Sequence, residues 1–126
     1  MENINKDKEY SDVYVLNLLI KELHHKSKRL YSLANEDYIF DYPQLELANL
    51  YSDFNSLKTT TYIMDEGHYE ITSFLSFWND FYVQLSEVIL NNDKNLSWLN
   101  SAYNQFDGQF IIVNEMLSNY LKQLKD

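Results

Sequence analysis

The chain contains no cysteine, one proline and two glycines. The absence of cysteine excludes disulfides, thiolate zinc sites, iron–sulfur clusters and cysteine nucleophiles. Sheet proteins need turn residues at short intervals, and phosphate-binding loops need several glycines in series, so the scarcity of both residues disfavours these two structures. The sequence therefore predicts long helices in a reduced, cytoplasmic protein.

Basic residues are also scarce, because 10 Lys and Arg face 19 Asp and Glu, which gives a net charge of −9. Residues 30–121 hold two of the bases and 13 of the acids, a balance of −11. Such a field repels nucleic acid and anionic membrane surfaces. No apolar run is long enough for a signal peptide or a membrane-spanning helix. We expect no nucleic-acid partner and no membrane partner.

Hydrophobic residues make up 45% and aromatic residues 16% of the 126 residues. That length fits one domain, and that composition is sufficient for a buried core. We expect a single helical domain over residues 1–126. Residues 1–10 are polar and acidic with no apolar run, so we expect them to be flexible.

Apolar residues recur at spacings of three and four in four stretches, which is typical of amphipathic helices. Ser11 is the expected N-cap of the first stretch, and Pro43 suits the first turn of the second. Connections are expected at residues 35–42, 65–67 and 91–93, with Asp65 and either Asn92 or Asp93 as caps. The four stripes are Val13, Leu16, Ile20, Leu23, Ser27, Leu30 and Ala34; Leu47, Leu50, Phe54 and Leu57; Ile71, Phe74, Trp78, Phe81, Leu85 and Val88; and Leu96, Leu99, Tyr103, Phe106, Phe110, Val113, Leu117, Tyr120 and Leu124.

Gly108 lies in the middle of the last stripe and allows two interpretations. A glycine inside one long helix costs about 1 kcal/mol relative to alanine, whereas a glycine between two short helices marks a turn. The unbroken spacing across Gly108 favours one helix. The predicted fold is an all-α, antiparallel up-down-up-down four-helix bundle, with five helices as the alternative if the last one breaks at Gly108.

No pattern of catalytic or cofactor-binding residues is present, so we expect no enzymatic activity, no cofactor and no metal. Glu22 and His25 form a single Glu-x-x-His pair. A di-iron bundle needs two such pairs and two further glutamates, all facing inward. Since Leu23 belongs to the buried stripe, Glu22 and His25 are expected on the solvent side. A metal enzyme built around them is the alternative.

The largest group of bases comprises Lys21, Lys26, Lys28 and Arg29. Cations in the C-terminal half of a helix complement its dipole, and we expect these to pair with acids on neighbouring helices. A nucleic-acid contact is the alternative, and the negative charge of the whole chain disfavours it.

Residues 35–54 combine acids and aromatic rings and contain no base. Tyrosines provide rigid contact area, and carboxylates beside them form charge-assisted hydrogen bonds with Lys or Arg of a partner. We therefore predict that this segment binds a basic protein. The alternative is that Tyr51 and Phe54 belong to the core and residues 38–42 merely cover one end of the bundle. The candidate partner-binding residues are Glu36, Asp37, Tyr38, Asp41, Tyr42, Glu46 and Asp53.

In its size, its acidity and this acidic-aromatic segment, the chain resembles the immunity proteins of contact-dependent growth inhibition and related polymorphic toxin systems. That resemblance implies an inhibitor that covers the active site of a basic toxin, commonly a nuclease, with carboxylates in place of the phosphates of its substrate. Two other functions are compatible with the same pattern. One is a phage-encoded inhibitor of a host defence nuclease, such as an anti-CRISPR that mimics DNA, and the other is a helical adaptor or structural protein.

Overall fold

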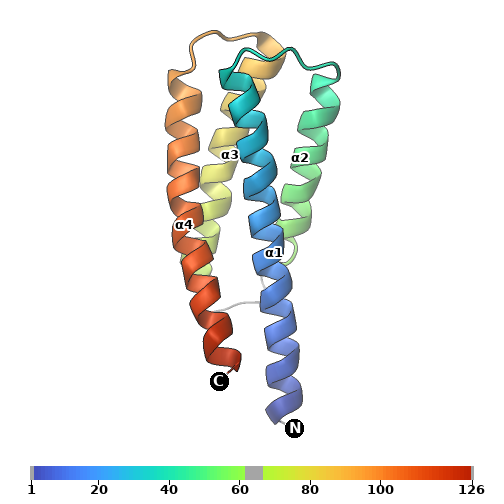
Figure 1. Ribbon diagram of the computed structural model, residues 1–126, viewed down its shortest axis with the longest axis vertical. Coiled ribbons are helices and arrows are strands. Elements are labelled where there is room, and N and C mark those ends of the chain that lie inside the picture. The colour runs from blue at the N-terminus through green and yellow to red at the C-terminus, as the bar shows by residue number, and fades with distance from the viewer. Residues whose placement is uncertain (1, 62–66, 126) are drawn as a thin grey trace.

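The structure is a computed structural model that describes residues 2–61 and 67–125, with side chains from residue 6 onward. It contains four helices: α1 (Glu2–Asn35), α2 (Pro43–Lys58), α3 (His68–Asn91) and α4 (Ser97–Lys125) (Figure 1). No strand occurs in the described residues, so the prediction of an all-α protein is confirmed. Across these two ranges, none of the helices is both long enough and apolar enough to cross a membrane.

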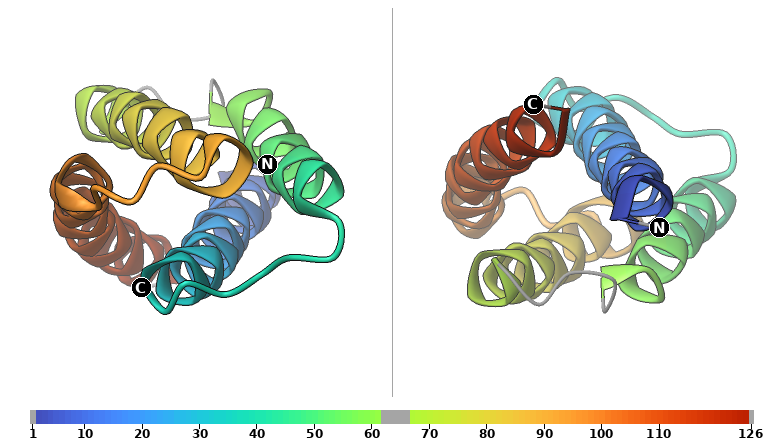
Figure 2. Two further views of the ribbon diagram at one scale, coloured as in Figure 1. Left: turned by 90° about the horizontal axis from the view of Figure 1, so that it is seen from above. Right: turned by 90° about the horizontal axis from the view of Figure 1, so that it is seen from below.

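The helices form a bundle around one shared core, and Figure 2 shows them as a ring when viewed along the long axis. In this ring, α1 and α3 each contact both α2 and α4. Figure 1 shows α1 and α3 ending at the top of the view, where α2 and α4 begin. The connections formed by residues 36–42 and 92–96 therefore lie together, and we call this part of the molecule the upper end.

The core consists of the predicted stripes, because one face of every helix turns toward the axis of the bundle. Aromatic rings fill its centre: Phe54 stacks on Trp78 with the ring centroids 4.2 Å apart, and Phe81 stacks on Phe106 at 5.5 Å. Ser27, the polar member of the first stripe, is buried and accepts a hydrogen bond of 3.0 Å from the Trp78 indole. Its hydroxyl thus satisfies a donor that burial would otherwise leave unpaired.

The helix α1 begins at Glu2, so the prediction that Ser11 is its N-cap is wrong. Neither glycine nor proline interrupts residues 2–10, and α4 provides a surface against which they continue as a helix. At this lower end the Tyr120 hydroxyl donates a hydrogen bond to the Glu9 carboxylate. A tertiary contact has overridden a local capping preference. The expected flexibility of residues 1–10 stays a prediction.

The helix α4 continues through Gly108, so the single-helix interpretation is confirmed and the five-helix alternative is wrong. Gly108 lies on the outer face of the helix, and a Cβ atom added there would meet no atom within 4 Å. The packing therefore does not require a glycine at this position.

We expect Gly108→Ala to raise the free energy of unfolding by about 1 kcal/mol, because alanine restricts the unfolded chain and costs nothing in an exposed helix. Urea unfolding of both proteins measures the difference. Gly67 is the control, because its φ is +78° and an added Cβ would lie 2.5 Å from Met116, so Gly67→Ala is expected to destabilise. A destabilised Gly108→Ala variant would contradict the continuous helix.

The connections differ in detail from those expected, and of the two predicted caps Asn92 and Asp93 it is Asn92 that ends a helix. Asn92, in the left-handed conformation with φ of 55°, ends α3. The first turn of α4 is instead capped by Asn95, whose side-chain oxygen accepts a hydrogen bond of 3.1 Å from the Ser97 backbone N–H. Asp93 in turn accepts one of 3.0 Å from the Asn95 backbone N–H. The predicted cap at Asp65 lies outside the described residues.

Candidate protein-binding site

The structure separates the seven candidate residues into two groups. The first group lies on the connection between α1 and α2 at the upper end and comprises Glu36, Asp37, Tyr38, Asp41 and Tyr42, all of them exposed. The second group, Glu46 and Asp53, lies on α2 and is only partly exposed. The predicted site is therefore one connection, with two further carboxylates on the helix that follows it.

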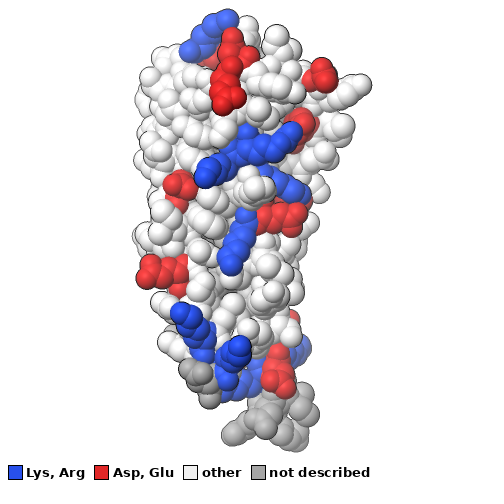
Figure 3. Space-filling view, in the orientation of Figure 1, with Lys and Arg blue, Asp and Glu red and all other residues white. Residues whose placement is uncertain are grey.

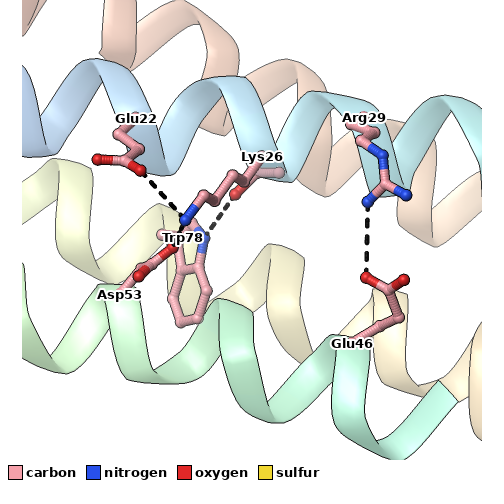
Figure 4. Close-up of polar contacts among 7 residues, drawn as sticks. Glu22, Lys26, Arg29, Glu46, Asp53 and Trp78 are labelled. Atoms are coloured by element: carbon pink, nitrogen blue, oxygen red, sulfur yellow. Dashed lines mark hydrogen bonds and ion pairs between the residues drawn. The ribbon is translucent and has the colours of Figure 1, made fainter. Parts of the chain in front are cut away.

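Glu46 and Asp53 bind the bases of α1. Lys26 donates a hydrogen bond of 2.7 Å to Asp53 and also pairs with Glu22, and Arg29 lies 3.5 Å from Glu46 (Figure 4). The hydrogen bond that Lys26 donates to Asp53, followed by the one that it donates to Glu22, raises the pKa of Lys26. These contacts confirm the expected pairing with acids on a neighbouring helix for Lys26 and Arg29. Figure 3 shows the same face, with Lys and Arg side chains gathered along α1 and acidic side chains beside them.

The connection of residues 36–42 is held by its backbone and by one aromatic side chain. The backbone N–H groups of Glu36 and Tyr38 both donate to the carbonyl of Leu33 and so end α1. Asp37 has a φ of 57°, a conformation that aspartate tolerates better than most residues. Phe40 packs against the core and makes a T-shaped contact with the Tyr38 ring, with the ring centroids 4.9 Å apart. The segment is thereby anchored at both ends and at Phe40.

The rest of the connection faces solvent. The side chains of Tyr38, Ile39 and Tyr42 are 51%, 86% and 70% exposed, and Leu45 in the first turn of α2 is exposed as well. The alternative interpretation required all of residues 38–42 to cover the end of the bundle. Of these residues, only Phe40 packs against the core. Exposed apolar groups that lie together are typical of interaction surfaces.

The charge at the upper end is predominantly negative. In the described part of the chain, the carboxylates of Glu36, Asp37 and Asp41 form neither an ion pair nor a side-chain hydrogen bond. Moreover, α1 and α3 both end here, and neither has a basic residue in its last turn. The C-termini of α1 and α3 carry partial negative charge and the N-termini of α2 and α4 carry partial positive charge, so the excess of negative charge comes from the carboxylates. The arrangement favours binding of a cationic surface.

A pocket of about 350 Å³ opens between the two connections of the upper end. Its wall is polar and apolar in nearly equal parts, and Asp37 and Tyr38 of the candidate site contribute to it, as do Asp93 and Lys94 from the other connection. No sequence pattern predicts this pocket, because its two sides lie about 50 residues apart and meet only in the bundle.

Sequence reasoning also missed a contact between His24 and α4. The imidazole stacks on Phe110 with centroids 3.7 Å apart, and its Nε2 donates a hydrogen bond of 2.7 Å to Asp107. Burial lowers the pKa of His24 more than the hydrogen bond and charge of Asp107 raise it. At neutral pH the contact is therefore a hydrogen bond from an uncharged imidazole. His24 and Asp107 lie 83 positions apart in the chain, so no local sequence pattern predicts their contact.

This contact predicts a pH dependence of stability. Because the pKa of His24 is lowered below 6.5 in the folded chain, the unfolded chain binds a proton at a higher pH than the folded chain does. The free energy of unfolding should therefore fall as the pH drops through 6.5 and stop falling, for this group, below the folded pKa. Urea unfolding of His24→Gln between pH 7 and pH 5 should show a shallower slope than the wild type. The exposed His25→Gln variant is the control, and equal slopes for wild type and His24→Gln would contradict the assignment.

Glu22 and His25 do not come together as a metal site would require. Both side chains are exposed, and the Glu22 carboxylate pairs with Lys26 at 3.2 Å. Within residues 6–61 and 67–125, no group of three or more His, Asp or Glu side chains gathers as metal ligands do. The described residues thus place Glu22 in an ion pair along the surface of α1.

Comparisons with protein-family models, with curated proteins and with solved structures find no match to this chain.

Proposed function

We propose that this protein is a non-catalytic acidic binding protein, and that it acts as an immunity protein that neutralises a basic toxin by covering its active site, most readily that of a nuclease domain. The observation that carries the proposal is the 36–42 connection. It presents three carboxylates that have no partner among the described residues, beside three exposed side chains, those of Tyr38, Ile39 and Tyr42.

Each part of this surface has a distinct role in the proposed mechanism. The carboxylates of Glu36, Asp37 and Asp41 steer a cationic partner toward the upper end and take the place of substrate phosphates. Tyr38 and Tyr42 then act as anchors, since exposed aromatic side chains that become buried slow dissociation more than they change association. Glu46 and Asp53 keep α2 against α1 and so hold the connection in place.

The proposal includes a cytoplasmic protein that folds as an antiparallel up-down-up-down bundle. The order of the contacts supports this topology: Lys26 pairs with Asp53, whereas Arg29, further along α1, pairs with Glu46, which comes earlier in α2. An antiparallel arrangement brings the 36–42 and 92–96 connections to one end. A partner can then contact both at once.

The test is co-purification followed by inhibition. Affinity-tagged protein is used to isolate a partner, which mass spectrometry identifies, and the purified partner is assayed for nuclease or other toxic activity. We expect a basic protein whose activity is abolished at one equivalent of this chain. A captured partner that is acidic, or a basic one that keeps its activity when saturated, would overturn the proposal. If the partner is a host defence nuclease rather than a toxin, the inhibitor function holds and the immunity assignment is wrong.

A further inference from the structure

Part of the wall of the pocket at the upper end is suited to an alkyl chain. Apolar side chains from three helices and both connections form this part, and the two acidic lining residues, Asp37 and Asp93, come from opposite connections. The apolar lining residues are Ala34, Ile39, Phe40, Pro43, Val88, Ile89 and Leu96. A wholly apolar ligand would remove water from these carboxylates without pairing them, which is unfavourable. A ligand with an alkyl stem and a cationic end contacts the apolar part of the wall and pairs with the carboxylates.

The backbone around the pocket contributes partial charges of both signs, including acceptors for a cation. The last turns of α1 and α3 contribute to its lining, and neither turn contains a base. The backbone N–H groups of Asn92 and Asp93 both donate to the carbonyl of Glu87. The carbonyl of Ile89 therefore receives no backbone N–H from the described residues and stays available as an acceptor. The N-terminal ends of α2 and α4 lie at the same end of the bundle and carry partial positive charge; α2 has Glu46, paired with Arg29, in its first turn, and α4 has no acid there.

One base, Lys94, also lines the pocket, and its positive charge opposes binding of a cation there. The charged lining residues are two acids, Asp37 and Asp93, and this one lysine, whose side chain is exposed. Tyr38, half exposed at the same pocket, provides an aromatic face for a planar cation. Guanidinium matches this set better than ammonium, because it is planar and its forked donors reach two acceptors at once.

We infer that this pocket receives an arginine side chain of the partner, with the methylene stem against the apolar wall and the guanidinium between the carboxylates of Asp37 and Asp93. The partner in this statement rests on the proposed function. The pocket itself does not, because its preference can be measured on the isolated chain.

The experiment uses Nα-acetyl-arginine amide as the ligand and the methyl resonances of Val88, Ile89 and Leu96 as reporters. The matched neutral ligand is Nα-acetyl-citrulline amide, which has the same shape without the charge. We expect saturable shifts of these methyl groups with the arginine compound and binding at least about tenfold weaker with citrulline, as loss of a charged hydrogen-bonding group implies. Lys94→Gln should tighten binding, because it removes the competing cation.

The double variant Asp37→Asn and Asp93→Asn should lose binding of the arginine compound. Asparagine keeps both local structures, since it tolerates the left-handed conformation at residue 37 and can accept the hydrogen bond from Asn95 at residue 93. The matched control carries Asp80→Asn and Glu115→Gln, two exposed acids outside the pocket lining, and should bind as the wild type does.

Equal binding of the two compounds, or shifts that persist in the Asp37 and Asp93 variant, would overturn the inference. The outcome is separable from that of the proposed function. If a basic partner is inhibited but the arginine compound does not bind, the pocket assignment alone is wrong. If the compound binds in the pocket but no partner is inhibited, the pocket assignment holds and the immunity function fails.

Discussion

Replacing Phe81 by alanine is expected to lower the free energy of unfolding by about 3–5 kcal/mol, which is typical of a large aromatic side chain removed from a core. The Phe81 side chain is completely buried and stacks on Phe106, and its ring also meets the edges of Tyr31 and Tyr103. The cavity would thus disrupt contacts to both α1 and α4. Urea unfolding followed by circular dichroism measures the change.

The matched control for Phe81→Ala is Tyr69→Ala on the same helix. Tyr69 is 79% exposed, so its replacement should change the free energy of unfolding by less than about 0.5 kcal/mol. A loss below about 1 kcal/mol for Phe81→Ala would place this residue outside the core and contradict the packing of α3 in the bundle.

The double charge reversal Glu36→Lys and Asp41→Lys is expected to weaken binding of the basic partner at least about tenfold, because like charges then meet at the contact. Both side chains are exposed and have no intramolecular partner in the described residues, so the fold should keep its stability. Asp37 is left unchanged, because its φ of 57° would be strained in lysine. Titration calorimetry with the purified partner measures the affinity.

The matched control reverses Asp80 and Glu115 instead, which changes the net charge by the same amount away from the upper end. This variant should keep most of the affinity, because charges farther away than about 8 Å are screened at physiological salt. Equal losses in the two double variants would mean that net charge alone, and not the 36–42 connection, determines binding.

The helices were predictable because their apolar spacing is a local property of the chain. The stripes from Val13 to Ala34 and from Leu47 to Leu57 are buried at every position. The spacing on both sides of Gly108 outweighs one residue of low helix propensity, so the sequence predicts the continuous helix that the structure has. The prediction of Ser11 as the N-cap was wrong because a capping preference contributes only about 1 kcal/mol. Packing of a whole helix segment against α4 stabilises the helix by more than that.

The candidate site was predictable only in part, because which carboxylates remain free depends on the neighbouring helix. Glu46 and Asp53 looked equivalent to Asp41 in the sequence, but the bundle places them opposite Arg29 and Lys26. The pocket and the His24–Asp107 contact were not predictable at all. Each brings together residues that are far apart in the chain, and no local pattern encodes the distance between two helices.

The most direct test of the central claim is the association rate of the purified partner, measured by stopped flow at increasing salt for the wild type and for the Glu36→Lys and Asp41→Lys variant. If the 36–42 connection steers the partner, wild-type association is faster at low salt and slows steeply as salt rises, while dissociation changes little. The variant should associate slowly with a flatter salt dependence. Identical association rates for the two proteins at every salt concentration would contradict the claim that this connection is the binding site.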